Sequence, residues 1–155
     1  MEKATLGAGC FWGVEAAFRQ VRGVEEVEVG YAGGHVADPS YKLVCSGATG
    51  HAEVVQITFD PAETSFEALL EVLWQIHDPT TKDRQGPDVG SQYRSIVLYH
   101  SEAQRETAER SKAALGASGQ YRNPIVTEIV PFTVFHRGEE YHQRYLEKHG
   151  KLYCR

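Results

Sequence analysis

The stretch Gly-Ala-Gly-Cys-Phe-Trp-Gly-Val-Glu, residues 7–15, constrains the fold of this chain more than any other, because the sequence pattern changes there. Residues 2–6, just before it, have the pattern of a short strand. After it, apolar residues recur at the spacing of one helix face, at Phe11, Val14, Phe18 and Val21. The sequence therefore predicts a strand-to-helix turn, with Cys10 in the turn.

Cys10 in such a turn would face the unpaired N–H groups and the positive dipole end of the helix. Both favour the thiolate over the thiol, so we expect a lowered pKa and a nucleophilic sulfur. The alternative is a small buried cysteine with Phe11 and Trp12 in the core. We favour a nucleophile beside an aromatic wall, because glycines crowd the turn and two adjacent aromatics cannot lie on one helix face.

The rest of the chain alternates strand-like and helix-like segments without a repeat or a linker. Polar loops occupy residues 35–51 and 80–92, and Pro131 predicts an edge position or a break in the last strand. This order predicts an α/β (α+β) fold in which helices pack against a mixed sheet in two layers, as one domain over residues 1–155. Strands are expected at residues 24–31, 53–59, 93–99 and 125–135, and further helices at residues 64–77, 101–115 and 139–148.

The balance of charged side chains argues against nucleic acid as a partner. The chain has 16 Lys and Arg against 21 Asp and Glu, a net charge of −5, and no cluster in which basic and aromatic residues alternate. No run approaches the ~20 apolar residues that a membrane-spanning helix needs, and the first residues lack the pattern of a signal peptide. We therefore expect a cytoplasmic protein that does not bind membranes.

The cysteines and histidines do not have the spacing of a metal site. The three cysteines contain no C-x-x-C, and the seven histidines contain neither H-x-x-x-H nor H-E-x-x-H. Nucleophilic or redox chemistry of the cysteines is therefore expected in place of metal binding.

Several polar side chains fall where a loop meets a strand, which is where functional sites gather. A glutamate among aromatic rings can stay protonated near neutral pH and act as an acid, and tyrosine hydroxyls can hydrogen-bond a substrate oxygen. The first loop and the strand after it contribute Tyr41, His51 and Glu53, and the second loop contributes Asp88 and Tyr93.

Three classes of function are consistent with these residues. A thiol-dependent oxidoreductase would use Cys10 as its nucleophile. A Cys-His-Asp acyl transferase would add His51 as the base. The third class is a module that binds oxidised peptides without turning them over.

Five separated motifs, in the same order, closely resemble those of the A-type peptide methionine sulfoxide reductases, and the resemblance runs over nearly the whole chain. Together they are far more specific than any one of them. The motifs are Gly9-Cys10-Phe11-Trp12-Gly13-Val14-Glu15, Gly30-Tyr31-Ala32-Gly33-Gly34, Thr49-Gly50-His51-Ala52-Glu53, Asp88-Val89-Gly90-Ser91-Gln92-Tyr93-Arg94-Ser95 and Tyr141-His142-Gln143.

The resemblance implies a role for each residue that matches these motifs. Cys10 would attack the sulfur of a methionine sulfoxide and become a sulfenic acid, while Glu53 protonates the departing oxygen. Tyr41 and Tyr93 would hydrogen-bond that oxygen. The substrate would be the S epimer, in oxidised proteins or as the free amino acid.

The resemblance also implies how the rest of the substrate is held. Phe11 and Trp12 would hold its S-methyl group, and Asp88 would orient its main chain or adjoining polar groups. No cofactor would be needed, and a monomer is expected.

Regeneration of the thiol would use a second cysteine. By its place near the C-terminus, Cys154 resembles the family's resolving cysteine, which forms a disulfide with Cys10 that thioredoxin then reduces. Many members carry two cysteines near the end and this chain carries one, so we expect the reductant to meet the Cys10–Cys154 disulfide directly. Cys45 is expected to be a buried or bystander thiol. The second thiol favours the oxidoreductase, because neither alternative needs one.

Overall fold

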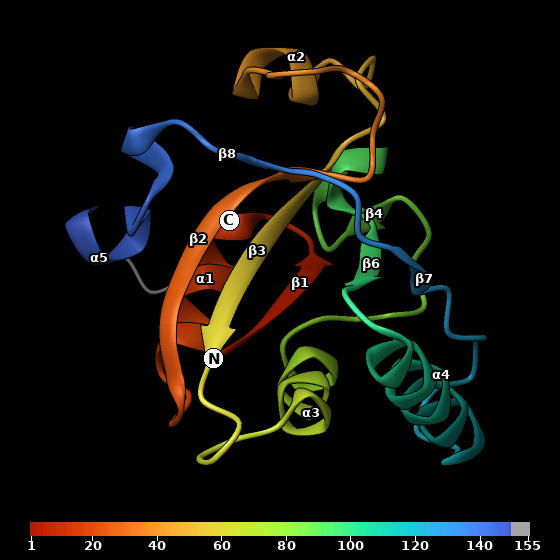
Figure 1. Cartoon of the computed structure of the whole chain (residues 1–155). Coiled ribbons are helices and arrows are strands. Elements are labelled where there is room, and N and C mark those ends of the chain that lie inside the picture. The colour runs from red at the N-terminus through yellow and green to blue at the C-terminus, as the bar shows by residue number, and fades with distance from the viewer. Residues whose placement is uncertain (150–155) are drawn as a thin grey trace.

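The structure is a computed structural model that describes residues 1–149, and its elements are shown in Figure 1. The strands are β1 (Glu2–Ala8), β2 (Val24–Ala32), β3 (Ala52–Phe59), β4 (Arg84–Gln85), β5 (Asp88–Val89), β6 (Ser95–Tyr99), β7 (Glu128–Pro131) and β8 (Phe135–Arg137). The helices are α1 (Phe11–Arg19), α2 (Tyr41–Cys45), α3 (Phe66–Ile76), α4 (Glu102–Ala117) and α5 (Tyr145–His149), with short 3-10 helices η1 (Ser91–Tyr93) and η2 (Glu140–His142).

Six strands form one mixed sheet in the order β7-β6-β1-β3-β2-β8. All neighbouring pairs are antiparallel except β6 and β7, which are parallel. The N-terminal strand β1 thus lies in the interior of the sheet, between β3 and β6. The expected class, a mixed sheet flanked by helices, is confirmed.

One face of the sheet holds most of the apolar core and is covered by α1, α3 and α4 (Figure 1). Because side chains alternate along a strand, residues two apart share this face. In β3 these are Val55, Ile57 and Phe59, which are at most 1% exposed. Glu53 has the same parity, so its side chain belongs to the face on which α1 packs.

The second face is covered by the chain that runs from β7 to β8, which crosses in front of the sheet in Figure 1. Pro131 ends β7, and β7 and β8 lie at opposite edges of the sheet. Both expectations for Pro131, a break and an edge position, are therefore correct. The residues that pack on this face include Val130, Phe132 and Phe135, against Ala32, Ala52, Val54, Ile96 and Leu98.

The two predicted loops contain more structure than their sequences indicated. Ser40 caps α2, because its Oγ accepts a hydrogen bond from the backbone N–H of Leu43. Residues 84–89 form the β4–β5 hairpin, and Tyr93 ends η1 instead of starting a strand. The predicted last helix is divided at Arg144, whose φ of 54° lies in the left-handed region.

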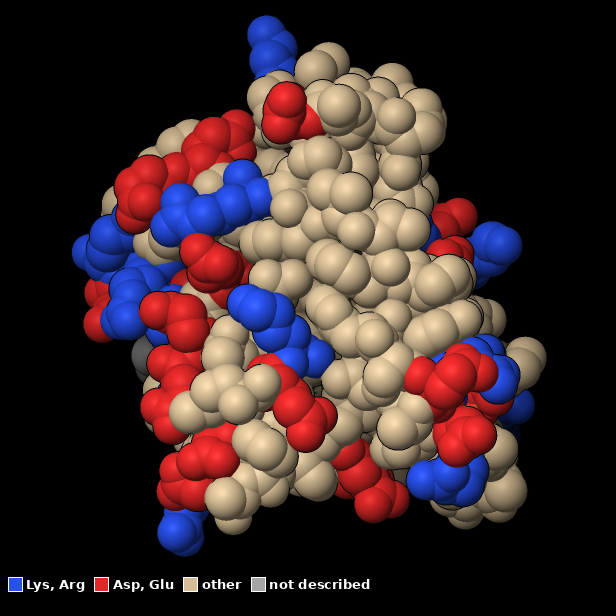
Figure 2. Space-filling model, in the orientation of Figure 1, with Lys and Arg blue, Asp and Glu red and all other residues tan. Residues whose placement is uncertain are grey.

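The surface has no broad basic area on the face shown in Figure 2, where Lys and Arg interleave with Asp and Glu toward the edges. An uncharged area occupies the centre and upper part of that face. No helix within residues 1–149 combines the length and apolarity needed to cross a membrane.

Candidate active site

Cys10 lies in the turn between β1 and α1, as predicted. It occupies the N-cap position of α1 and is half-buried. Gly9 has a φ of 99°, and a Cβ there would lie 2.9 Å from the side chain of Gln85, so the turn requires a residue without a side chain. The sulfur is thereby carried at the end of a helix whose first N–H groups have no partners within the helix.

Glu53 reaches this turn from the neighbouring strand β3. It is 1% exposed, and its Oε1 accepts a hydrogen bond from the backbone N–H of Phe11 at 3.2 Å. Since Phe11 directly follows Cys10, this bond holds the buried carboxyl at the helix terminus that carries the thiol. The structure therefore brings together the two residues that the sequence assigned to nucleophile and acid.

Tyr41 approaches the same region from α2. Its backbone N–H donates to Glu139 Oε2 at 2.9 Å, and the other oxygen of Glu139 accepts from the hydroxyl of Tyr31 at 2.7 Å. Burial raises the pKa of Tyr41 well above its ordinary value, and the charges of Cys45 and Glu53 raise it further. The hydroxyl therefore keeps its proton and remains a hydrogen-bond donor.

Tyr93 ends η1, which packs against β3, the strand of Glu53. Burial raises its pKa, and so do the negative charges of Glu53, Cys45, Asp88 and, last in size, Cys10. Tyr93 is therefore within electrostatic range of Glu53 and Cys10. Asp88, half-buried in β5, lies within the same group.

Phe11 and Trp12 diverge, as the helix spacing requires. Phe11 is 1% exposed and packs against Tyr31 and Tyr41, with ring centroids 5.7 Å and 6.3 Å away. Trp12 is partly exposed, and Tyr145 stacks on it at 3.8 Å with ring planes 9° apart. Phe11 is thus a core residue as well as a member of the site, whereas Trp12 offers an accessible ring.

His51 does not have a nitrogen available to act as a base. Its Nδ1 accepts from the N–H of Gly34 at 3.0 Å, so its Nε2 carries the proton and donates to the carbonyl of Val36 at 2.7 Å. Burial lowers its pKa, which keeps the ring neutral. His51 holds the loop before β3 in place through these two hydrogen bonds. It therefore cannot serve as the base of the acyl-transfer alternative.

Cys45 lies in α2, on the same helix as Tyr41. It is exposed, so the expectation of burial is wrong, while the bystander role stays a prediction; its thiol hydrogen-bonds the hydroxyl of Tyr41 one helical turn away. Burial of part of the side chain raises its pKa, and the hydrogen bond from Tyr41 acts in the opposite direction. Cys154, the predicted resolving cysteine, lies outside the described residues.

The segment from Glu139 to Arg144 supports the site, a role that its sequence did not indicate. Besides Glu139, it contains Gln143, whose side chain bonds the N–H and the carbonyl of Val29 in β2 at 3.0 Å and 2.9 Å. The N–H of Arg144 donates to both carboxyl oxygens of Glu15 in α1. The available signal was the Tyr141-His142-Gln143 motif, one of the five that carry the family resemblance.

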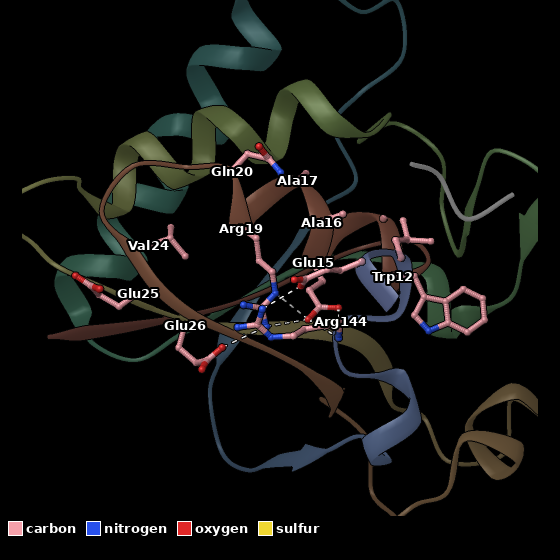
Figure 3. Close-up of a pocket in the computed structure, with 13 residues that line it drawn as sticks. Trp12, Glu15, Ala16, Ala17, Arg19, Gln20, Val24, Glu25, Glu26 and Arg144 are labelled. Atoms are coloured by element: carbon pink, nitrogen blue, oxygen red, sulfur yellow. Dashed lines mark hydrogen bonds and ion pairs between the residues drawn. The ribbon is translucent and has the colours of Figure 1, made fainter. Parts of the chain in front are cut away.

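A hollow of about 1020 Å³ opens beside α1, the start of β2 and α5 (Figure 3). Its wall carries paired charges, with Arg19 bonded to Glu15 at 3.0 Å and to Glu26 at 3.2 Å. Burial raises the pKa of Glu15, and the bonds from Arg144 and Arg19 oppose that rise. Trp12 lines the hollow, whereas Cys10 and Glu53 do not, so it adjoins the candidate site without containing it.

Three carboxylates, on Glu25, Asp60 and Glu63, have oxygens within 4.8 Å of one another and are the group among residues 1–149 that could hold a metal ion. Glu25 and Glu63 are exposed, and Asp60 follows the end of β3 opposite to Glu53. Exposed acidic groups are common on protein surfaces. This group is therefore unrelated to the candidate site.

The fold and the site together define an α/β enzyme built around a thiol and a buried carboxyl. The sequence profile of a family described as peptide methionine sulfoxide reductase matches residues 2–155. The chain belongs to the peptide methionine sulfoxide reductase family and is an oxidoreductase of that class.

Curated relatives agree over nearly the full length. The protein named peptide methionine sulfoxide reductase MsrA from Methanosarcina mazei is 58% identical over 152 residues, 98% of this chain and 72% of that protein. The MsrA of Methanothermobacter thermautotrophicus is 58% identical over 153 residues, 99% of this chain and 90% of that protein.

Solved structures agree as well. Reduced Mxr1 from Saccharomyces cerevisiae has a TM-score of 0.92 at 38% identity, covering 99% of this chain and 88% of that one. Methionine sulfoxide reductase A of Corynebacterium diphtheriae has a TM-score of 0.87 at 36% identity, covering 99% and 77%. Mxr1 in complex with Trx2 has a TM-score of 0.67 at 28% identity, covering 93% and 84%.

Proposed function

We propose that this enzyme reduces the S epimer of methionine sulfoxide, in proteins and as the free amino acid, with Cys10 as nucleophile and Glu53 as acid. The observation that carries the proposal is the hydrogen bond from the Phe11 N–H to Glu53 Oε1, which sets a buried carboxyl beside the N-cap cysteine. A sulfoxide oxygen is a poor leaving group until it is protonated, so both groups are needed at one place.

In the first step, the Cys10 thiolate attacks the sulfoxide sulfur while Glu53 gives a proton to the sulfoxide oxygen. The oxygen is transferred to Cys10, which becomes a sulfenic acid, and methionine leaves. The sulfur of methionine gains two electrons and the sulfur of Cys10 loses two. The hydroxyls of Tyr41 and Tyr93, which keep their protons, hydrogen-bond the oxygen as its charge changes.

The aromatic residues account for recognition of the substrate. The rings of Phe11 and Trp12 offer an apolar contact for the S-methyl group, and a methyl on one side with oxygen donors on the other selects one epimer. Asp88 lies near Tyr93, where it can bind the N–H groups of the substrate's main chain. None of these steps uses a metal or an organic cofactor.

In the second step, the thiol of Cys154 attacks the sulfenic acid, and a Cys10–Cys154 disulfide forms as water leaves. A thioredoxin then reduces the disulfide by thiol exchange. The complex of Mxr1 with Trx2 supports this partner, because Mxr1 has the same fold. Cytoplasmic location and a monomeric state remain predictions.

The reduction of methyl p-tolyl sulfoxide with dithiothreitol as reductant tests the proposal. We expect the S epimer to be consumed and the R epimer to persist. Equal consumption of both epimers would contradict the assigned pocket. Binding without any consumption would instead identify a peptide-binding module.

A further inference from the structure

His142 is the buried residue that links the parts of the candidate site. It ends η2 and is 0% exposed. Its Nδ1 accepts a hydrogen bond from the indole Nε1–H of Trp12 at 2.9 Å. The partly exposed indole of Trp12 is thus hydrogen-bonded to the fully buried imidazole of His142.

The imidazole also packs against the other rings of the site. Its centroid lies 4.3 Å from that of Tyr41 and 5.1 Å from that of Phe11. On the solvent side, the ring of Tyr141 covers the imidazole, with the two ring centroids 4.0 Å apart. His142 therefore contacts three residues to which the proposed function assigns substrate contacts.

Trp12 is held from a second direction as well. Tyr145 stacks on its indole with ring planes 9° apart, which fixes the plane of the ring. Stacking alone permits the indole to slide and turn within that plane, whereas a directional hydrogen bond fixes one orientation. The bond to His142 supplies that restraint.

Stability does not explain a histidine at this position. Because Nδ1 accepts from Trp12, the ring proton is on Nε2, and Nε2 has no hydrogen-bond partner among residues 1–149. A buried donor without an acceptor is destabilising. An apolar residue of similar size would fill the space without that penalty, so what the imidazole adds is its acceptor nitrogen.

The neutral ring is the form that can accept this bond. Burial lowers the pKa of His142, opposed in part by the carboxylate of Glu139. A protonated ring would carry a proton on Nδ1 and could not accept from Trp12.

We propose that His142 is a positioning residue for substrate binding: through Nδ1 it fixes the orientation of the Trp12 indole that contacts the substrate's S-methyl group. This inference rests on the proposed function, because that function assigns the methyl contact to Trp12. His142 itself acts only through Trp12.

The first test observes the bond directly and does not depend on activity. The chain has two tryptophans, and the second, Trp74, donates its Nε1–H to Ser111 Oγ at 2.8 Å. In NMR spectra of nitrogen-15-labelled protein, His142→Leu should shift the Trp12 indole signal and speed its exchange with solvent, while the Trp74 signal stays unchanged. His142→Asn, which places an amide oxygen near the position of Nδ1, should restore most of the wild-type signal.

The second test measures kinetics in two backgrounds. In the wild-type background, His142→Leu should raise KM for methionine-S-sulfoxide roughly 2- to 10-fold, the range of one hydrogen bond, with a smaller effect on kcat. His142→Asn should recover part of this loss. Trp12→Phe removes the N–H donor, so adding His142→Leu to it should raise KM no further.

These outcomes separate the inference from the proposed function. An unmoved Trp12 signal in His142→Leu, or an equal rise in KM in the Trp12→Phe background, would overturn the positioning role. If the wild-type enzyme does not reduce the sulfoxide, the proposed function fails, while the NMR result still reports the bond. Should His142→Leu not fold, His142→Phe, which keeps a ring but has no acceptor nitrogen, gives the same comparison in both Trp12 backgrounds, with a raised KM expected beside Trp12 and a KM ratio near one expected in Trp12→Phe.

Discussion

Oε1 of Glu53 accepts a hydrogen bond from the backbone N–H of Phe11, 3.2 Å away, and this bond joins β3 to the first residue of α1. The carboxyl is held by backbone geometry at the point where the cysteine leaves the turn. Because Glu53 is 1% exposed, its carboxyl is shielded from bulk water. The position of the proposed acid, Glu53, relative to the proposed nucleophile, Cys10, is therefore set by the sheet and the helix themselves.

Replacing Glu53 with glutamine should slow the first turnover by ~10²–10⁴-fold, because an amide keeps the shape but cannot give up a proton. Rapid-quench measurement of methionine release without reductant gives this rate. Glu67→Gln, on the exposed side of α3, is the matched control and should release methionine at the wild-type rate. An unchanged first turnover in Glu53→Gln would make Glu53 a structural residue.

Replacing Cys10 with serine should abolish sulfoxide reduction and preserve the fold, because the change removes the thiolate with little loss of volume. Circular dichroism checks the fold, and the epimer assay checks activity. Near-normal turnover by this variant would rule out Cys10 as the nucleophile.

The sequence predicted the elements around Cys10 well because they depend on local patterns. The change from strand to helix and the break at Pro131 are each readable from residues close in the chain. Ser101 caps α4, where a helix was expected to begin, whereas α3, expected to begin at residue 64, is capped by Ser65. A local run of hydroxyl residues indicates that a helix begins there, but it does not determine which of two adjacent hydroxyls forms the cap.

What the sequence did not reveal depends on contacts between distant segments. The bond between Trp12 and His142 joins residues 130 positions apart, and the bond between Tyr41 and Glu139 joins residues 98 positions apart. Contacts of this kind leave no periodic pattern in the sequence from which they could be predicted. Tyr93 was misplaced in a strand because its turn is stabilised by a hydrogen bond to Gly90, whose φ of 145° is not encoded by any alternation.

The two remaining cysteines should separate in function. Cys154→Ser should still release about one equivalent of methionine without reductant, since one thiol reduces one sulfoxide, but should lose turnover supported by thioredoxin. Dithiothreitol should rescue it, because a small thiol can reach the sulfenic acid without a protein disulfide as intermediate. Measuring both assays side by side distinguishes the steps.

Cys45→Ser is the control for that experiment. A serine hydroxyl can still hydrogen-bond Tyr41, so both assays should stay close to wild type. The reverse pattern, with thioredoxin-supported turnover lost in Cys45→Ser and kept in Cys154→Ser, would make Cys45, in α2, the resolving cysteine.

The free energy of unfolding should fall as pH drops below about 6.5, the ordinary pKa of histidine. Burial lowers the pKa of His51, His77 and His142 in the folded protein, so below that pH the unfolded chain binds more protons than the folded one. Each of these histidines changes the free energy of unfolding by at most about 1.4 kcal/mol per pH unit, and only in the pH range between its pKa in the folded protein and its pKa in the unfolded chain.

Urea unfolding at pH 8, 6.5 and 5.5 measures this slope. His77→Gln should reduce the slope by the share of one histidine, because His77 is buried between Leu73 and Ser95, each bonded to it at 2.7 Å. A free energy of unfolding that stays constant from pH 8 to 5.5 would contradict the prediction.

The interior position of β1 has a consequence for how the chain folds. Leu6 pairs with Val55 in β3 and with Val97 in β6, so the strand that leads to Cys10 is completed by segments from the middle and the second half of the chain. Loop-closure entropy opposes such distant pairings, and proteins that depend on them fold slowly. A nascent chain that has not yet reached β6 holds Cys10 on an incomplete sheet, so the nucleophile acquires its surroundings only after most of the polypeptide has been synthesised.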